Sequence, residues 1–102
     1  FRFDVESIVL DGQAIVLLKG ELDMSTSERF GEVVRLLHSN GTTRLVIDLS
    51  ELDFVDFSGL REIVVAQRRQ REIGGDVVLH APKAHVRRVL EIVGLDRILT
   101  IT

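Results

Sequence analysis

Alternation of apolar and polar positions opens the chain and predicts a β-hairpin. Residues 1–6 alternate apolar and polar side chains, and apolar runs cover residues 8–10 and 14–18. Between these runs stand Asp11 and Gly12, a pair favoured in two-residue turns because both positions take positive φ. We therefore expect two antiparallel strands, followed by a loop over residues 20–24.

The next segment has the period of an amphipathic helix. Apolar side chains recur from Phe30 to Leu37 on one face, and Asn40 with Gly41 ends the pattern. Ser25 and Glu28 have the spacing of a capping box, in which each side chain bonds an amide at the start of the helix. The pattern predicts a first helix that begins after Ser25.

Two further helices alternate with three apolar runs. The second helix is expected from Gly59 to about residue 72. The third is expected to begin at Pro82 and to end just before Gly94, which would be its C′ residue. The buried stripe of the third helix is expected to consist of Val86, Val89, Leu90 and Val93.

The apolar runs predict strands at residues 44–49, 76–80 and 98–101, with residues 50–53 as a polar connection. The first of these runs is nearly continuous, which favours a central strand covered on both faces. The element order is ββαβαβαβ. We therefore expect one α/β domain over residues 1–102, with a mixed or mostly parallel sheet and helices packed on it.

Composition narrows the class of protein. Hydrophobic residues make up 45% and charged residues 28%, as in a globular domain. The chain has no cysteine, which excludes disulfides and thiolate metal sites, and we expect a cytoplasmic protein. A formal net charge of −3 argues against nucleic acid as a partner, and the basic run at residues 68–71 is interpreted as a solvated helix face. The apolar runs are too short to span a bilayer and no signal peptide is visible; because the chain starts at Phe1 rather than Met, it could be part of a longer protein.

No constellation of catalytic residues emerges. His38, His80 and His85 are scattered, and no spacing unites them with a nucleophile or a carboxylate pair. There is no glycine-rich phosphate loop of the required form, although a nucleotide pocket at the strand ends stays open. We expect no enzyme activity, no metal site and no cofactor.

The segment 54–60 is the candidate functional site. If Asp56 is the N-cap of the second helix, Val55 and Leu60 take the positions of a hydrophobic staple. If Ser58 is the cap, the corresponding partners, Phe57 and Glu62, do not match. We therefore take Asp56 as the cap, which leaves the Ser58 hydroxyl free in the first turn.

Ser58 would then lie at the positive end of a helix. Unpaired first-turn amides and the helix dipole favour negative charge there, so a phosphate on Ser58 would be tolerated and hydrogen-bonded. A serine before a glycine is also an ordinary cap or turn residue, so position alone does not establish modification. Phe57 has two interpretations: it folds back onto the core, or it is an exposed aromatic anchor for a partner.

The segments LVIDLS (45–50) and FVDFSGL (54–60) resemble the signature of STAS domains, in particular of bacterial anti-sigma factor antagonists. The segments GELD (20–23), Gly74 with Gly75, and VRRVLEIVGLD (86–96) extend the resemblance along the whole chain.

The resemblance implies that Ser58 is the phosphoacceptor of a partner switch. The partner would be an anti-sigma factor, a serine kinase-type ATPase that also holds a sigma factor, and a separate phosphatase would reverse the modification. ATP would belong to that partner, so this chain would need no cofactor. A monomer is the default expectation for its oligomeric state. Asp23, Asp56, Phe57, Ser58 and Gly59 are the partner-binding candidates.

One position departs from the family pattern. Many members carry a second Ser or Thr where this chain has Phe57, which implies a different choice of partner. The alternative function is a STAS module in a membrane transport assembly, such as an anion transporter or a lipid-transport subunit, without phosphoregulation.

Overall fold

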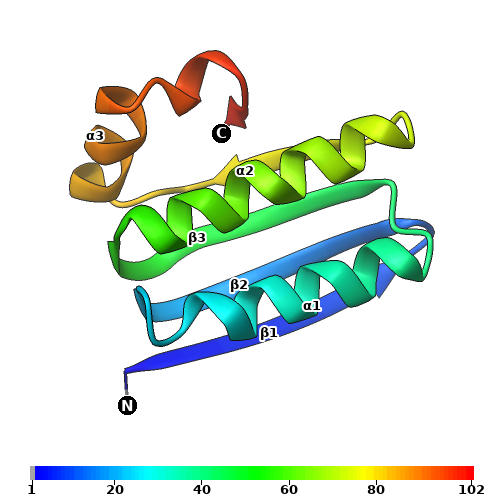
Figure 1. Cartoon of the computed structure of the whole chain (residues 1–102), viewed down its shortest axis with the longest axis horizontal. Helices are drawn as coiled ribbons and strands as arrows, with labels where there is room; N and C mark the ends of the chain where they lie inside the picture. Colours follow the sequence, from blue (N-terminus) through cyan, green and yellow to red (C-terminus); the bar gives the residue numbers. More distant parts are fainter. Residues whose placement is uncertain (1) are drawn as a thin grey trace.

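The computed structural model describes residues 2–102, in which one five-stranded sheet has the order β1-β2-β3-β4-β5 (Figure 1). β1 (Phe3–Leu10) is antiparallel to β2 (Gln13–Leu22), and the other neighbouring pairs are parallel. The remaining strands are β3 (Arg44–Val55), β4 (Asp76–His80) and β5 (Thr100–Ile101). The expected mixed sheet is confirmed. Phe1, which we expected in the first strand, lies outside the described residues.

The helices α1 (Ser27–Ser39) and α2 (Phe57–Glu72) lie side by side on one face of the sheet (Figure 1). α3 (Ala84–Ile92) is followed by the short 3₁₀ helix η1 (Leu95–Arg97). Within residues 2–102, every helix is too short or too polar to cross a lipid bilayer.

The hydrophobic core lies between the sheet and its helices. Its strand members alternate along the chain, as Ala14, Val16 and Leu18 do in β2, because successive side chains point to opposite faces. Each helix contributes a stripe, for example Phe30 from α1 and Ile63 from α2. This alternation leaves the other sheet face outside the core.

The expected hairpin turn is confirmed. Asp11 has φ 51° and Gly12 has φ 77°, so both turn residues adopt the left-handed conformation that a two-residue hairpin favours. Leu10 pairs with Gln13 across this turn.

The two central strands are longer than expected. The predicted loop at residues 20–24 and the predicted connection at residues 50–53 are largely strand, because β2 and β3 pair as far as Leu22 and Val55. Register shifts between Leu17 and Lys19 and between Gly20 and Glu21 keep the strands paired through polar sequence. Backbone pairing therefore extends beyond the apolar run that sequence periodicity detects.

The expectation that residues 44–49 are covered on both faces is wrong. Leu45, Ile47 and Leu49 belong to the core, whereas Val46 and Asp48 on the other face are half-buried. The buried side chains of all three helices belong to the same core, so within residues 2–102 the helices cover one face of the sheet.

Helix boundaries differ at several ends. α1 has Thr26 at its N-cap rather than Ser25, and α2 begins at Phe57 rather than Gly59. α3 begins at Ala84 rather than Pro82, because Ala81 (φ 55°) and an extended Lys83 delay the helix.

At the end of the chain, Val93 is exposed rather than buried, because α3 stops before it and Gly94 (φ 80°) turns the chain away. η1 occupies the next turn, so the last strand is restricted to β5 and Ile98 is not part of it. Gly94 follows the C-cap of α3, as predicted.

Candidate functional site

The carboxyl ends of β2 and β3 bring two loops together. Leu22 pairs with Val55 at the end of the parallel ladder, and the N–H of Asp56 donates to the Leu22 carbonyl at 3.1 Å. Asp23 and Asp56 therefore emerge at the same edge of the sheet, where they line one shallow depression. The structure thus brings together the two acidic residues that the sequence singled out.

Asp56 is the N-cap of α2, as predicted. Its backbone is extended (φ −110°, ψ −172°), and its Oδ1 accepts from the N–H groups of Ser58 at 2.9 Å and Gly59 at 3.2 Å. Val55 and Leu60, the expected staple pair, are both buried in the core. This cap fixes where α2 starts.

The Ser58 side chain is half-buried in the first turn of α2. Within residues 2–102 its hydroxyl forms no hydrogen bond, because Asp56 takes the capping role. Two of the first-turn amides that we expected to bond a phosphate, those of Ser58 and Gly59, are already bonded to Asp56 Oδ1. A phosphate added here would therefore face solvent and a neighbouring carboxylate.

Gly59 allows α2 to pack closely on the strand ends. A Cβ at this position would lie 2.6 Å from Cγ of Leu22 and 2.9 Å from Cγ2 of Val55. The requirement is steric, since the residue is helical and buried. Gly59 thus positions the first turn, and Ser58 with it, rather than offering a contact surface of its own.

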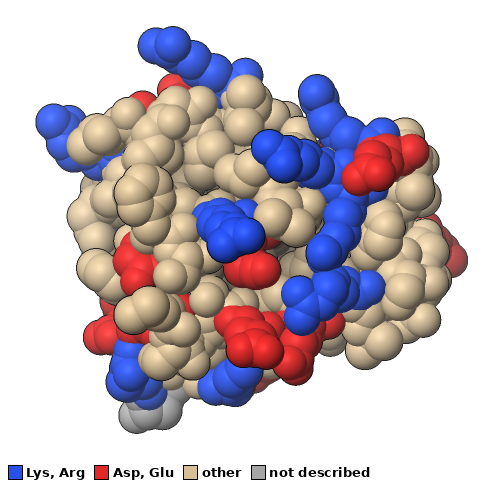
Figure 2. All heavy atoms as spheres, in the orientation of Figure 1, with Lys and Arg blue, Asp and Glu red and all other residues tan. Residues whose placement is uncertain are grey.

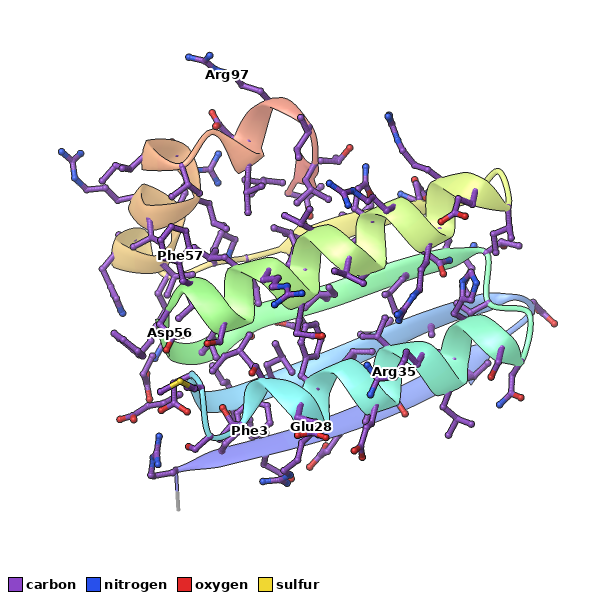
Figure 3. All side chains as sticks on the ribbon, viewed as in Figure 1. Phe3, Glu28, Arg35, Asp56, Phe57 and Arg97 are labelled. Atoms are coloured by element: carbon purple, nitrogen blue, oxygen red, sulfur yellow. The ribbon has the colours of Figure 1, made fainter. Side chains whose placement is uncertain are left out.

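Phe57 is 82% exposed, so the first of its two interpretations, folding onto the core, is wrong. Figure 3 shows Phe57 at the start of α2, on the side toward α3, with Asp56 close by. The side chain lines a broad depression along α2 together with Met24 and Ser58. An exposed aromatic ring beside a free hydroxyl is well placed to contact a partner.

Asp23 holds the loop between β2 and α1. Its Oδ1 accepts from the Ser25 hydroxyl at 2.8 Å and from the Ser25 N–H at 2.9 Å, and its Oδ2 pairs with Arg2. These contacts lower the pKa of the Asp23 carboxyl, and the hydrogen bond from the Ser25 hydroxyl is the largest cause. Burial comes next in size and raises the pKa. The Ser25 amide, Arg2 and Thr26 lower it further, in that order. The predicted capping box is wrong, because the Ser25 hydroxyl serves Asp23 instead of the helix.

Sequence reasoning missed three residues near the site. Met24 is 82% exposed and lines both depressions, and Phe54 is 47% exposed beside it. The buried Thr26 hydroxyl donates to the Glu21 carbonyl at 2.8 Å and accepts from the Asp23 N–H at 2.9 Å, which ties the loop down. In the sequence, Met24 is an apolar residue between the polar Asp23 and Ser25, and this pattern could have indicated an exposed apolar side chain.

The three histidines lie apart from one another. His38 Nδ1 contacts Gln70 Oε1 at 2.9 Å, His80 Nδ1 contacts Thr102 Oγ1 at 2.8 Å, and His85 Nε2 lies near the Asp53 carbonyl. In the described part of the chain, no group of His, Asp or Glu is arranged to hold a metal ion.

A family model described as "Mlab, STAS domain" matches residues 8–100. The chain belongs to the STAS domain family. This STAS domain is 33% identical over 95 residues to the anti-sigma F factor antagonist of Paenibacillus polymyxa, covering 88% of this chain and 78% of that one.

Solved structures share the fold. The Thermotoga maritima protein TM1081 has a TM-score of 0.89 and 26% identity, covering 95% of this STAS domain and 84% of that chain. The Bacillus cell fate determinant SpoIIAA in its phosphorylated form has a TM-score of 0.76 and 23% identity, covering 98% and 90%. At that identity the likeness to SpoIIAA shows the fold alone.

Proposed function

We propose that this STAS domain is an anti-sigma factor antagonist that is switched by phosphorylation of Ser58. The observation that carries the proposal is the Ser58 hydroxyl, half-buried, without a hydrogen bond in residues 2–102, and beside the exposed Phe57. Relatives at about one-third identity named as such antagonists support it.

In its unmodified form the surface around Ser58 combines apolar and acidic groups. Met24 and Phe57 supply exposed apolar area, and Asp23 and Asp56 supply carboxylates. We propose that the anti-sigma factor covers this surface, which frees the sigma factor. Apolar contacts at the centre of an interface require that water be excluded from them.

Phosphorylation would oppose that contact. A phosphate adds about −1.5 to −2 charges at pH 7 and resists transfer out of water. The Ser58 and Gly59 amides are engaged by Asp56, so the phosphate would lack their donors and would be repelled by the Asp56 carboxylate. The modified surface would therefore release its partner while the fold stays intact.

The chemistry of the switch would belong to the partners. We propose that the anti-sigma factor is the kinase and supplies ATP, that a separate phosphatase restores Ser58, and that this chain is a monomeric binding protein without enzymatic activity. These events would take place in the cytoplasm.

The phosphorylation step can be tested directly. The chain is incubated with ATP and the serine kinase-type anti-sigma ATPase encoded by the same genome, and the modified residue is mapped by mass spectrometry. We expect phosphate on Ser58 and none on the Ser58→Ala variant, whereas Ser50→Ala, which removes an exposed hydroxyl on β3, should behave as wild type. Phosphate on another residue, or none, would contradict the proposal.

Partner binding is a separate test. In calorimetry with the same ATPase, Ser58→Asp should bind at least about tenfold more weakly than wild type, and Phe57→Ala should lose about 1–2 kcal/mol of binding free energy. Phe57→Ala should unfold at the wild-type temperature, because the ring is exposed. Unchanged affinity in both variants would place the interface elsewhere.

A further inference from the structure

A broad depression follows the exposed side of α2 beyond the Ser58 region. It has a volume of about 950 Å³ and is lined mainly by α2, with α1 on one side and the segment after α3 on the other. Ser58 and Arg69 both line it, which gives it a length of about 16 Å along the helix axis at 1.5 Å per residue. The surface around Ser58 is therefore only one end of this longer depression.

Basic side chains dominate the other end of this depression. Figure 2 shows Lys and Arg gathered over the second half of α2 and the adjoining part of α1. Arg69 of α2 and Arg35 of α1, which Figure 3 labels, line the depression away from Ser58, whereas Arg61 lies about one helical turn from Ser58. The basic run at residues 68–71, interpreted from sequence as a solvated helix face, continues this group.

These arginines have no counter-ion in the described part of the chain. The ion pairs within residues 2–102 all use other cations, such as Lys83 with Asp53 and Arg87 with Glu91. The Glu62 carboxylate also lines the depression, but it is packed against Gly31 of α1. A Cβ on Gly31 would lie 2.6 Å from Oε2 of Glu62. The lining therefore presents guanidinium groups that remain available to bind carboxylates.

The floor of the depression is apolar. Val64 and Val65 of α2 are half-buried there, and Leu60 lies beside them. An occupant that matches this surface needs apolar side chains toward α2 and carboxylates toward the arginines. A nucleic acid fits less well, because its phosphates and polar base edges would leave the apolar floor of Val64 and Val65 without apolar contact.

We propose that the exposed side of α2 is a docking surface for an acidic, amphipathic segment of a protein partner. Arg35 and Arg69 bind its carboxylates, and Val64 and Val65 contact its apolar side chains. This extends, and in that sense rests on, the proposed function, since Ser58 lies in the same depression. The arginine end would add electrostatic attraction and specificity to contacts made around Ser58.

The test uses a synthetic helical peptide with leucine on one face and glutamate on the other, titrated into the ¹⁵N-labelled chain. We expect chemical-shift changes in α1 and α2 along the depression and affinity that falls with added salt. The double variant Arg35→Gln/Arg69→Gln should bind about fivefold more weakly, because two exposed ion pairs are lost. Gln preserves helix propensity, so this variant should fold.

A matched control removes two arginines outside the depression. Arg88→Gln/Arg97→Gln loses the same charge from exposed positions and should bind as wild type. The proposal is overturned if the control loses as much affinity, if the shifts map elsewhere or are absent, if a peptide with lysine for glutamate binds as well, or if a DNA duplex binds more tightly. None of these outcomes depends on phosphorylation or on the anti-sigma factor, so failure here is distinguishable from failure of the proposed function.

Discussion

Two carboxylates at the edge of the sheet hold the site by different means. Asp56 caps α2 and thereby leaves the Ser58 hydroxyl without a hydrogen bond to any residue from 2 to 102, whereas Asp23 organises the loop before α1 through Ser25 and Arg2. Each aspartate is therefore structural first, and each also adds negative charge to the depression that the two residues share. Variants can separate these two contributions.

Replacement of Asp56 should show the energetic value of the cap. Asp56→Ala should lower the free energy of unfolding by about 1 kcal/mol, because the Ser58 and Gly59 amides lose their acceptor. Asp56→Asn should stay within a few tenths of wild type, since its carbonyl can accept the same bonds. Urea unfolding measures both; an equal loss in the two variants would mean that charge, not capping, is what matters.

The lowered pKa of Asp23 makes stability depend on pH in the acid range. Its charged form is favoured in the folded state, so the stabilisation is complete above the unfolded pKa of about 3.9 and is lost as pH falls through the lower folded value. Urea unfolding at several pH values should therefore show Asp23→Asn less stable than wild type at neutral pH, with the difference disappearing in strong acid. Ser25→Ala, which removes the largest cause, should raise the Asp23 pKa measured by carboxyl ¹³C NMR. An unchanged pKa in that variant would refute the role of the Ser25 hydroxyl.

At the scale of elements, the close approach of α2 to the ends of β2 and β3 decides where the first turn lies. Gly59 faces Leu22 and Val55, and the Asp56 amide bonds back to Leu22. The helix start is thus fixed by packing as well as by capping. The position of Ser58 therefore depends on the packing of Gly59 against Leu22 and Val55 and on the Asp56 cap.

The Gly59→Ala substitution has two opposing effects on stability, one from helix propensity and one from packing. Propensity alone predicts a gain of about 1 kcal/mol, but the new methyl would overlap two core side chains, which typically costs about 1–3 kcal/mol. We expect a net loss of stability in thermal or urea unfolding, while Ser58→Ala stays within about 0.5 kcal/mol of wild type. A stabilised Gly59→Ala variant would show that the first turn moves freely.

At the scale of the whole molecule, the sheet has one long free edge. In the described residues 2–102, β1 pairs only with β2, and several of its apolar residues near the turn, such as Ile8 and Leu10, are exposed. Asp4 and Glu6 place carboxylates on this edge strand. Glu6 pairs with Lys19 of β2 at 3.8 Å, and Asp4 Oδ1 accepts from the Val5 N–H at 3.0 Å. Charges on an edge strand oppose pairing between copies of a chain.

Removal of these charges should promote self-association. We expect wild type to sediment as a monomer, and Asp4→Asn/Glu6→Gln to form dimers or larger species at high concentration. Glu72→Gln/Asp96→Asn removes the same charge from exposed positions away from the edge and should remain monomeric. Equal association of both variants would point to net charge rather than to the edge.

Local patterns in the sequence determined most of the architecture. Periodicity gave the order of strands and helices, Asp11 with Gly12 gave the hairpin, and the staple pair gave Asp56 as the cap, because each of these signals acts between residues close in the chain. The family resemblance likewise came from contiguous motifs. The phosphoacceptor role of Ser58 stays a prediction.

Only the tertiary structure decided the lengths of β2 and β3, the exposure of Phe57 and the grouping of Arg35 with Arg69. Strand length beyond the apolar run depends on backbone pairing with a neighbour, which leaves no side-chain pattern. Exposure of a residue at a turn, and the meeting of two helices, depend on where distant segments pack. The sequence by itself thus determined that Ser58 lies in the first turn of a helix capped by Asp56. The tertiary structure decided which side chains surround it, because those come from segments distant in the chain.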